Sequence, residues 1–140
     1  VVDQYNNLYL SLNCYDSLYI YDTSGQHIYV DSILWTNRQM KFSSAGKKLQ
    51  WVSSLPGRTD FLVTDLDVDI RGNTYLSVNF SYNHKDTAIF RAAGFSPPDT
   101  SLLYVGAVFV IDTSGQGKNW FHLRSTVILS ITNITVHDTN

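Results

Sequence analysis

The sequence contains 140 residues, with 10 Lys or Arg and 12 acidic residues, and its net charge is −2. This balance excludes the strongly basic surface with which proteins bind nucleic acids. All 12 acidic residues are Asp, which excludes chemistry that requires a glutamate, such as the last ligand of an EF-hand. The length predicts one domain over residues 1–140.

Apolar and polar residues alternate with a period of two along most of the chain, which is typical of β-strands. One helical turn is predicted over 84–93, where alanines concentrate before Gly94 and two prolines. About nine or ten strands and this little helix predict an all-β, antiparallel β-sandwich. The strands are expected over residues 8–13, 18–20, 27–30, 49–52, 61–70, 74–81, 102–112, 119–123 and 126–136.

The pentapeptide Asp-Thr-Ser-Gly-Gln occurs twice, at 22–26 and at 112–116, each time after an apolar run. Asp-Thr-Ser-Gly also invites an aspartic-protease interpretation, but in that motif glycine follows the second residue directly. Asp bonded to its own backbone, followed by Gly with positive φ, is ordinary turn chemistry. We therefore predict two similar hairpin turns, or a remnant of duplication inside one sandwich, and two related β units are the alternative.

Three aspartates, Asp65, Asp67 and Asp69, alternate with apolar residues along the predicted strand 61–70. Alternate side chains on one strand lie roughly 6.5–7 Å apart, which is too far for two of them to share one calcium ion unaided. We therefore expect a solvated polar face that discourages aggregation. A calcium site at these three residues is the alternative, and no other metal or cofactor is expected.

Two glycosylation sequons are present, at Asn79 and Asn133, and Asn79 falls on the strand face opposite the apolar residues. The single cysteine, Cys14, excludes an intrachain disulfide. The longest apolar run, over 102–111, is too short to cross a membrane. The sequons favour a secreted or cell-surface glycoprotein with N-linked glycans, and a cytosolic β domain in which the sequons occur by chance is the alternative.

The segment 14–22 reads Cys-Tyr-Asp-Ser-Leu-Tyr-Ile-Tyr-Asp and resembles a segment of CUB domains, which are extracellular β-sandwiches. The segments 76–80 and 93–95 resemble a late strand and a Gly-Phe pair of the same family. The resemblance covers about 25 residues and implies the fold and an extracellular location. Asp16 matches one aspartate of the calcium-binding members, whereas no glutamate matches their other ligand.

No nucleophile motif, phosphate loop or pair of metal-spaced histidines is present, so we predict no enzymatic activity. The 125–140 segment contains a long terminal strand rich in Val, Ile and Thr, which either pairs within its own sheet or adds to a neighbouring sheet by β-strand addition. This favours a module of adhesion or assembly whose partners are proteins, including further copies of itself. A carbohydrate-binding module that stacks sugars on Tyr19, Tyr21 or Trp35 is the alternative.

Overall fold

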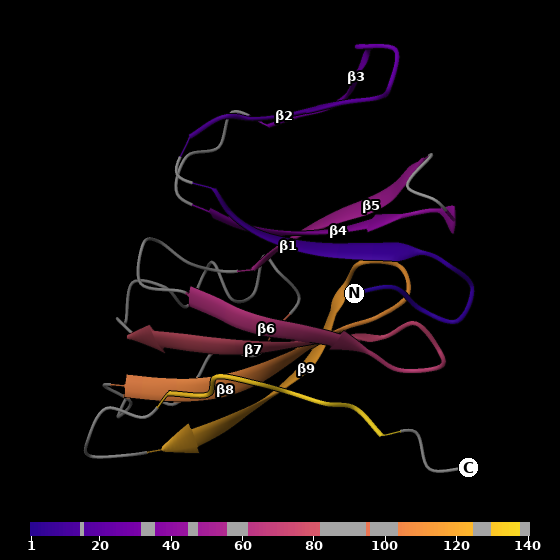
Figure 1. Ribbon diagram of the computed structural model, residues 1–140. Coiled ribbons are helices and arrows are strands. Elements are labelled where there is room, and N and C mark those ends of the chain that lie inside the picture. Colours follow the sequence, from indigo (N-terminus) through magenta and orange to yellow (C-terminus); the bar gives the residue numbers. More distant parts are fainter. Residues whose placement is uncertain are drawn as a thin grey trace.

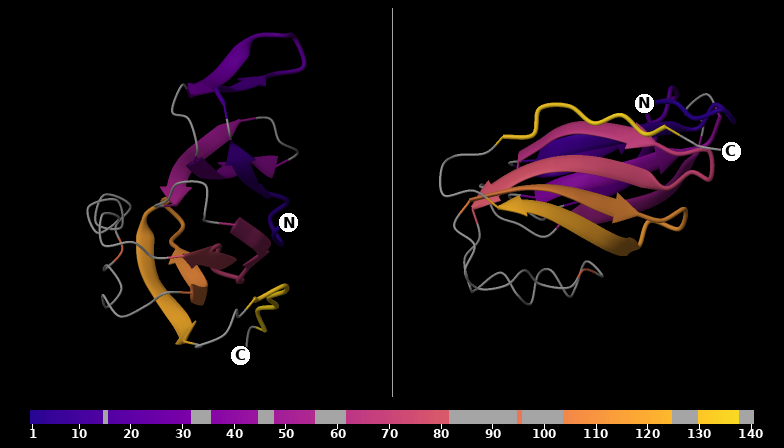
Figure 2. Two further views of the ribbon diagram at one scale, coloured as in Figure 1. Left: turned by 90° about the vertical axis from the view of Figure 1, so that its left-hand side faces the viewer. Right: turned by 90° about the horizontal axis from the view of Figure 1, so that it is seen from below.

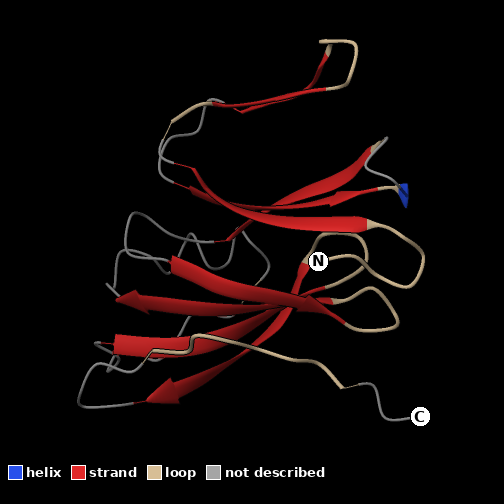
Figure 3. Ribbon diagram, in the orientation of Figure 1, coloured by secondary structure: helices blue, strands red, loops and turns tan. Residues whose placement is uncertain are grey.

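The computed structural model describes residues 1–14, 16–31, 36–44, 48–55, 62–81, 95, 104–124 and 130–137 (Figure 1). Within these ranges the chain is all-β and contains no α-helix, and the short helical element drawn in blue in Figure 3 is a 3₁₀ turn at Ser44. The nine strands are β1 (Leu8–Cys14), β2 (Leu18–Tyr21), β3 (His27–Asp31), β4 (Thr36–Phe42), β5 (Leu49–Leu55), β6 (Leu62–Val68), β7 (Thr74–Ser81), β8 (Tyr104–Ile111) and β9 (Gly117–Arg124). The predicted all-β fold is confirmed.

The strands form two main sheets and a separate hairpin, and every pairing is antiparallel. The first sheet has the order β1-β4-β5, and the second has the order β6-β7-β8-β9. Strands β2 and β3 form the hairpin, which projects away from both sheets in Figures 1 and 2. The two main sheets face each other, and this packing is consistent with the predicted β-sandwich.

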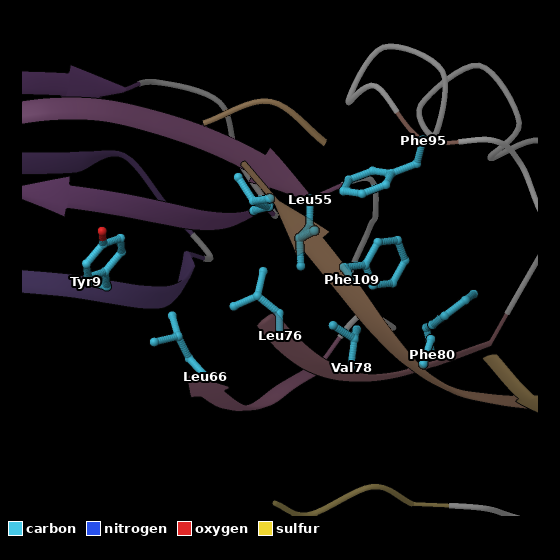
Figure 4. Packing of buried hydrophobic residues seen from close by; sticks show 10 residues of the cluster. Tyr9, Leu55, Leu66, Leu76, Val78, Phe80, Phe95 and Phe109 are labelled. Carbon is cyan, nitrogen blue, oxygen red and sulfur yellow. The ribbon is translucent and has the colours of Figure 1, made fainter. Parts of the chain in front are cut away.

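The alternation of apolar residues explains which face of the second sheet turns toward the first. In β7, Leu76 and Val78 are fully buried, and Leu76 pairs with Phe109 across the ladder to β8. Tyr9 supplies the opposing surface from β1 (Figure 4). The core consists of Tyr9, Leu55, Leu66, Leu76, Val78, Phe80, Phe95, Ala107, Phe109 and Ile111.

Strands β1 and β6 have the most extensive contact of any two described strands from different sheets. A hollow of about 300 Å³ lies between them, lined by Tyr9 and Ser11 on one side and by Val63 and Leu66 on the other. Toward the later strands, large aromatic rings fill the space, and Trp120 stacks on Phe109 with ring centroids 5.5 Å apart. Because these rings separate the sheets toward the later strands, the sheets approach each other most closely at β1 and β6.

Three expected elements need correction. Strand β4 was not predicted, because its sequence Thr-Asn-Arg-Gln-Met-Lys-Phe is mostly polar, although Arg38 and Gln39 are buried. The strand expected over 61–70 ends at Val68, where Asp69 begins a turn. Residues 130–136 of the strand expected over 126–136 pair with no other described strand. The helical turn predicted over 84–93 lies outside the described residues.

The contact between Trp51 and the β8–β9 turn yields a test of how the two sheets join. Trp51 donates a hydrogen bond from Nε1 to the Thr113 carbonyl oxygen at 3.0 Å, and a Cβ on Gly115 would lie 2.9 Å from the Trp51 ring. We expect Gly115→Ala to lower the free energy of unfolding by about 2–4 kcal/mol, measured by urea denaturation.

Gly25→Ala is the matched control. Gly25 has φ +83°, close to the +87° of Gly115, but no atom lies within 4 Å of the point that a Cβ at Gly25 would occupy. Its expected cost is therefore only that of the left-handed backbone, about 1–2 kcal/mol. Equal losses in the two variants would contradict the close approach of the Trp51 ring to Gly115.

Candidate functional site

The outer face of the second sheet, which points away from the first sheet, carries a row of polar side chains that bind an extended segment. Asp65 and Asp67 lie on β6 and Asn79 lies on β7. Residues 130–137 run along this face on the side opposite the first sheet (Figure 2). We call this arrangement the acceptor row, and it consists of Thr64, Asp65, Asp67 and Asn79.

Backbone N–H groups of the extended segment donate to the acceptor row. The Val136 N–H donates to Asp67 Oδ2 at 2.7 Å, and the Ile134 N–H donates to Asp65 Oδ2 at 2.9 Å. Residues two apart in an extended chain direct their N–H groups to the same side, as alternate residues on β6 do with their side chains. The spacing of the carboxylates therefore matches the spacing of the amides they bind.

Asn79 pairs with Ile131 in both directions. Its Oδ1 accepts the Ile131 N–H at 2.9 Å, and its Nδ2 donates to the Ile131 carbonyl oxygen at 3.0 Å. The side-chain amide thus takes the place that a peptide group has in an antiparallel ladder. Thr64 also donates from Oγ1 to the Ile131 oxygen at 2.7 Å.

A β-bulge in β6 places Thr64 in this position. The register with β7 shifts between Val63 and Asp65, so Thr64 has no partner residue of its own in the described ladder. Its hydroxyl lies 2.9 Å from Ser77 Oγ, which belongs to the outer face. A bulge re-aims a side chain in this way, and here it adds a member to the acceptor row.

The expectation of a solvated face at Asp65, Asp67 and Asp69 is wrong for these residues. Asp65 and Asp67 are half-buried and accept the amides of the extended segment, because that segment lies along the face where solvent was expected. Asp69 is only 8% exposed and belongs to the following turn. The described residues contain no group of three potential metal ligands, and calcium binding stays a prediction.

The two sequons lie in different surroundings. Both hydrogens of the Asn79 Nδ2 group are used, since it also donates to Ser130 Oγ at 3.1 Å. A glycan at this nitrogen and these two hydrogen bonds exclude each other. Asn133 is exposed, so a glycan there does not conflict with the packing.

The predicted aromatic surface is present on the hairpin in part. Tyr19 and Tyr21 are 52% and 53% exposed, and both rings contact His27, with centroid distances of 6.0 and 4.3 Å. Trp35 lies outside the described residues. Cys14 is half-buried at the end of β1.

Two turns of the main sheets use one aspartate in the same way. Asp69 Oδ1 accepts the N–H groups of Arg71 and Asn73 at 2.9 and 2.8 Å, and Asp69 Oδ2 accepts hydrogen bonds from the Asn73 side chain and the Tyr75 hydroxyl. Asp3 repeats this pattern with the corresponding residues of its own turn, Tyr5, Asn7 and Tyr9. The carboxylate therefore closes each turn by binding groups that no ladder satisfies.

The two Asp-Thr-Ser-Gly-Gln segments form a second type of turn, as predicted. Asp22 Oδ1 accepts the N–H groups of Ser24 and Gln26, and the Ser24 hydroxyl donates to the same oxygen at 2.6 Å. Asp112 makes the corresponding three bonds in the β8–β9 turn. The glycine that follows has positive φ in both turns.

Hydrogen bonds to these carboxylates lower their pKa values. Burial alone would raise the pKa of Asp69, but the bonds from Asn73, Arg71 and Tyr75 outweigh burial and hold the pKa below its usual 3.8. The pKa of Asp3 is lowered through the same balance. For Asp112 the Ser114 hydroxyl is the largest cause of a lowered pKa.

The sequence also contains a repeat that is longer than the pentapeptide and that the prediction of two similar turns did not include. Residues 2–13 read Val-Asp-Gln-Tyr-Asn-Asn-Leu-Tyr-Leu-Ser-Leu-Asn, and residues 68–79 read Val-Asp-Ile-Arg-Gly-Asn-Thr-Tyr-Leu-Ser-Val-Asn. Seven of the twelve positions are identical, and they include the Asp, Asn and Tyr of the turn network. Direct comparison of the chain with itself would have found this repeat.

The chain matches no protein family, no curated protein and no solved structure in comparisons with known proteins. The resemblance to CUB domains therefore stays a prediction. None of the described residues belongs to a helix with the length and apolar character of a membrane span.

The turn network predicts both a loss of stability and a pH dependence. Removing the buried Asp69 carboxylate leaves the groups that donate to it unsatisfied, so we expect Asp69→Ala to lower the free energy of unfolding by about 2–3 kcal/mol at pH 7. Because the folded-state pKa lies below 3.8, this stability is present above pH 3.8 and is lost as pH falls through the folded-state value.

Urea denaturation between pH 2 and pH 7 measures both effects. Asp69→Asn should be less stable than the wild type at pH 7 and should lose less stability on acidification. Asp16→Asn is the control, since Asp16 is exposed and its only hydrogen bond among those in the described structure is from the adjacent Ser17 N–H. If the stability of Asp69→Asn fell with pH as steeply as that of the wild type, this role of the carboxylate would be contradicted.

Proposed function

We propose that the chain is a non-enzymatic extracellular module of adhesion or assembly, which acts by holding an extended polypeptide segment against the outer face of its second sheet. The observation that carries this proposal is the match between the acceptor row and the amides of Ile131, Ile134 and Val136. The row binds backbone groups, so it places little demand on the sequence of the bound segment.

The way in which the segment is held supports exchange between molecules. Residues 130–136 are joined to the second sheet through side chains of the acceptor row and not through a backbone ladder. The same segment of another copy offers the same groups to the same row. Mutual exchange then preserves every bond while linking two copies, which is how domain swapping builds oligomers.

Features of the sequence support the extracellular part of the proposal. Asn133 is exposed within its sequon, and glycosylation at such a site occurs in secreted proteins. One cysteine cannot form an intrachain disulfide, and the core between the two packed sheets stabilises the fold without one.

Light scattering over a range of protein concentrations tests the proposal. We expect the mass to rise above that of one chain with concentration, and we expect the double variant Asp65→Ala/Asp67→Ala to shift this rise to at least tenfold higher concentration. Asp16→Ala is the matched control, since this aspartate lies outside the acceptor row. A wild-type protein that stays a monomer at all concentrations would contradict assembly by exchange.

The exposed rings of Tyr19 and Tyr21 favour a carbohydrate-binding module as the second candidate. Aromatic rings at the surface provide flat apolar platforms on which sugars stack. This alternative predicts a monomer that immobilised glycans retain, with less retention in Tyr21→Ala than in Tyr5→Ala. Tyr5 is also exposed but lies outside the hairpin.

A further inference from the structure

We infer that the chain is built from repeating units of 66 to 68 residues, each of which forms one antiparallel sheet, as the four strands of the second sheet and the three strands of the first do. The outer face of the second sheet then packs against the sheet of a further unit, and residues 130–136 are the first strand of that unit. This goes beyond the proposed function, since it concerns how sheets of one polypeptide stack and not how separate molecules associate.

The two sheets of the structure are corresponding parts of two units. Strands β1, β4 and β5 have the same order and direction as β7, β8 and β9. At the base of the Asp3 turn, Val2 bridges to Leu8, and at the base of the Asp69 turn, Val68 pairs with Thr74 in the same way. The N-terminal residues thus occupy the place in the first unit that the end of β6 occupies in the second.

A third copy of the pattern begins at residue 130. Residues 130–137 read Ser-Ile-Thr-Asn-Ile-Thr-Val-His, and residues 62–69 read Leu-Val-Thr-Asp-Leu-Asp-Val-Asp. The Thr and the Val are identical, and both Ile residues match aliphatic residues of β6. In this register Asn140 corresponds to Asn6 and Gly72, the two residues with positive φ in the Asp3 and Asp69 turns.

The first strand of the third copy packs against the second unit in the same way that the first strand of the second unit packs against the first unit. Strand β6 lies beside β1, at the strand of the first unit where the sheets approach most closely. The segment 130–136 lies beside β6 and β7 on the opposite face (Figure 2). The first strand of each unit therefore lies beside the second strand of the unit before it, β6 beside β1 and residues 130–136 beside β7.

The sheets of such a series lie closest together toward their first strands and diverge toward their last strands. Large rings, including Trp51 and Trp120, fill the space between the two sheets toward their last strands. Repetition of four-stranded sheets around a line of first strands is a radial arrangement, in which each sheet packs against the next and each unit contacts its neighbours. The occupant of the outer face is accordingly a further sheet of the same kind.

The part of the outer face that the extended segment does not reach is apolar. Phe121 and Leu123 on β9 are 59% and 56% exposed, and they alternate with Trp120, which faces the first sheet. Phe121 pairs with Val108 on β8, so the two apolar side chains are neighbours on one face. A face that combines this apolar area with an acceptor row for a first strand fits a sheet of the repeat.

Extending the full chain by one unit tests the inference. A second copy of residues 73–124 placed directly after Asn140 continues the register of the repeat without a linker. We expect the 140-residue chain to melt at least 5 °C below the extended chain, which should remain a monomer by light scattering. The matched control carries Leu76→Asp and Val78→Asp in the added copy only, which removes the apolar face that would contact the second sheet.

Phe121→Asp in the original copy gives an independent readout. It should change the melting temperature of the 140-residue chain by less than 2 °C, because Phe121 is exposed there, and it should abolish the gain in the extended chain. An added copy that produces no gain, or a gain that the control or Phe121→Asp leaves intact, would overturn the inference. The proposed assembly function fails separately, through the mass of the 140-residue chain.

Discussion

The structure depends on aspartate carboxylates that accept backbone N–H groups where no strand can supply an acceptor. Four turns are closed in this way, by Asp3, Asp22, Asp69 and Asp112. Asp65 and Asp67 on β6 make the same kind of hydrogen bond to a different element, because they accept backbone amides of residues 134 and 136. A shorter side chain than glutamate is suited to this role, because it reaches nearby backbone with less freedom to lose.

Because its aspartates bind backbone amides, the second sheet makes contacts through both of its faces. The inner face is apolar and packs against the first sheet, whereas the outer face combines the acceptor row with Phe121 and Leu123. A sheet in a two-layer sandwich needs only one such face. The second face therefore links the fold to the proposed function, because it already holds a polypeptide segment of the kind that assembly or further sheets would supply.

The alternation of residues was sufficient to predict the fold class and most strands, because packing of one apolar face dominates their sequences. It failed at β4, where Asn37, Arg38 and Gln39 are buried despite their polarity. No periodicity can reveal that a polar strand lies in the middle of a sheet. Tertiary context decides this, through pairing with β1 on one side and β5 on the other.

The candidate site was only partly predictable for a related reason. The sequence showed that Asp65, Asp67 and Asn79 lie on the polar face of their strands, and this position is correct. It could not show that residues 130–136 cover that face, since the partners lie 52 to 69 residues away. The repeat of residues 2–13 was visible in the sequence, but its meaning depends on the matched hydrogen bonds of Asp3 and Asp69.

Amide hydrogen exchange of the extended segment tests most directly whether the acceptor row holds it. We predict that the amides of Ile131, Ile134 and Val136 exchange at least tenfold more slowly than those of Thr132 and Thr135, for which the described structure shows no acceptor in the row. We also predict that Asp67→Ala removes the protection of Val136. Equal exchange at all five amides, at the rate of an unfolded chain, would contradict the claim that the acceptor row holds this segment.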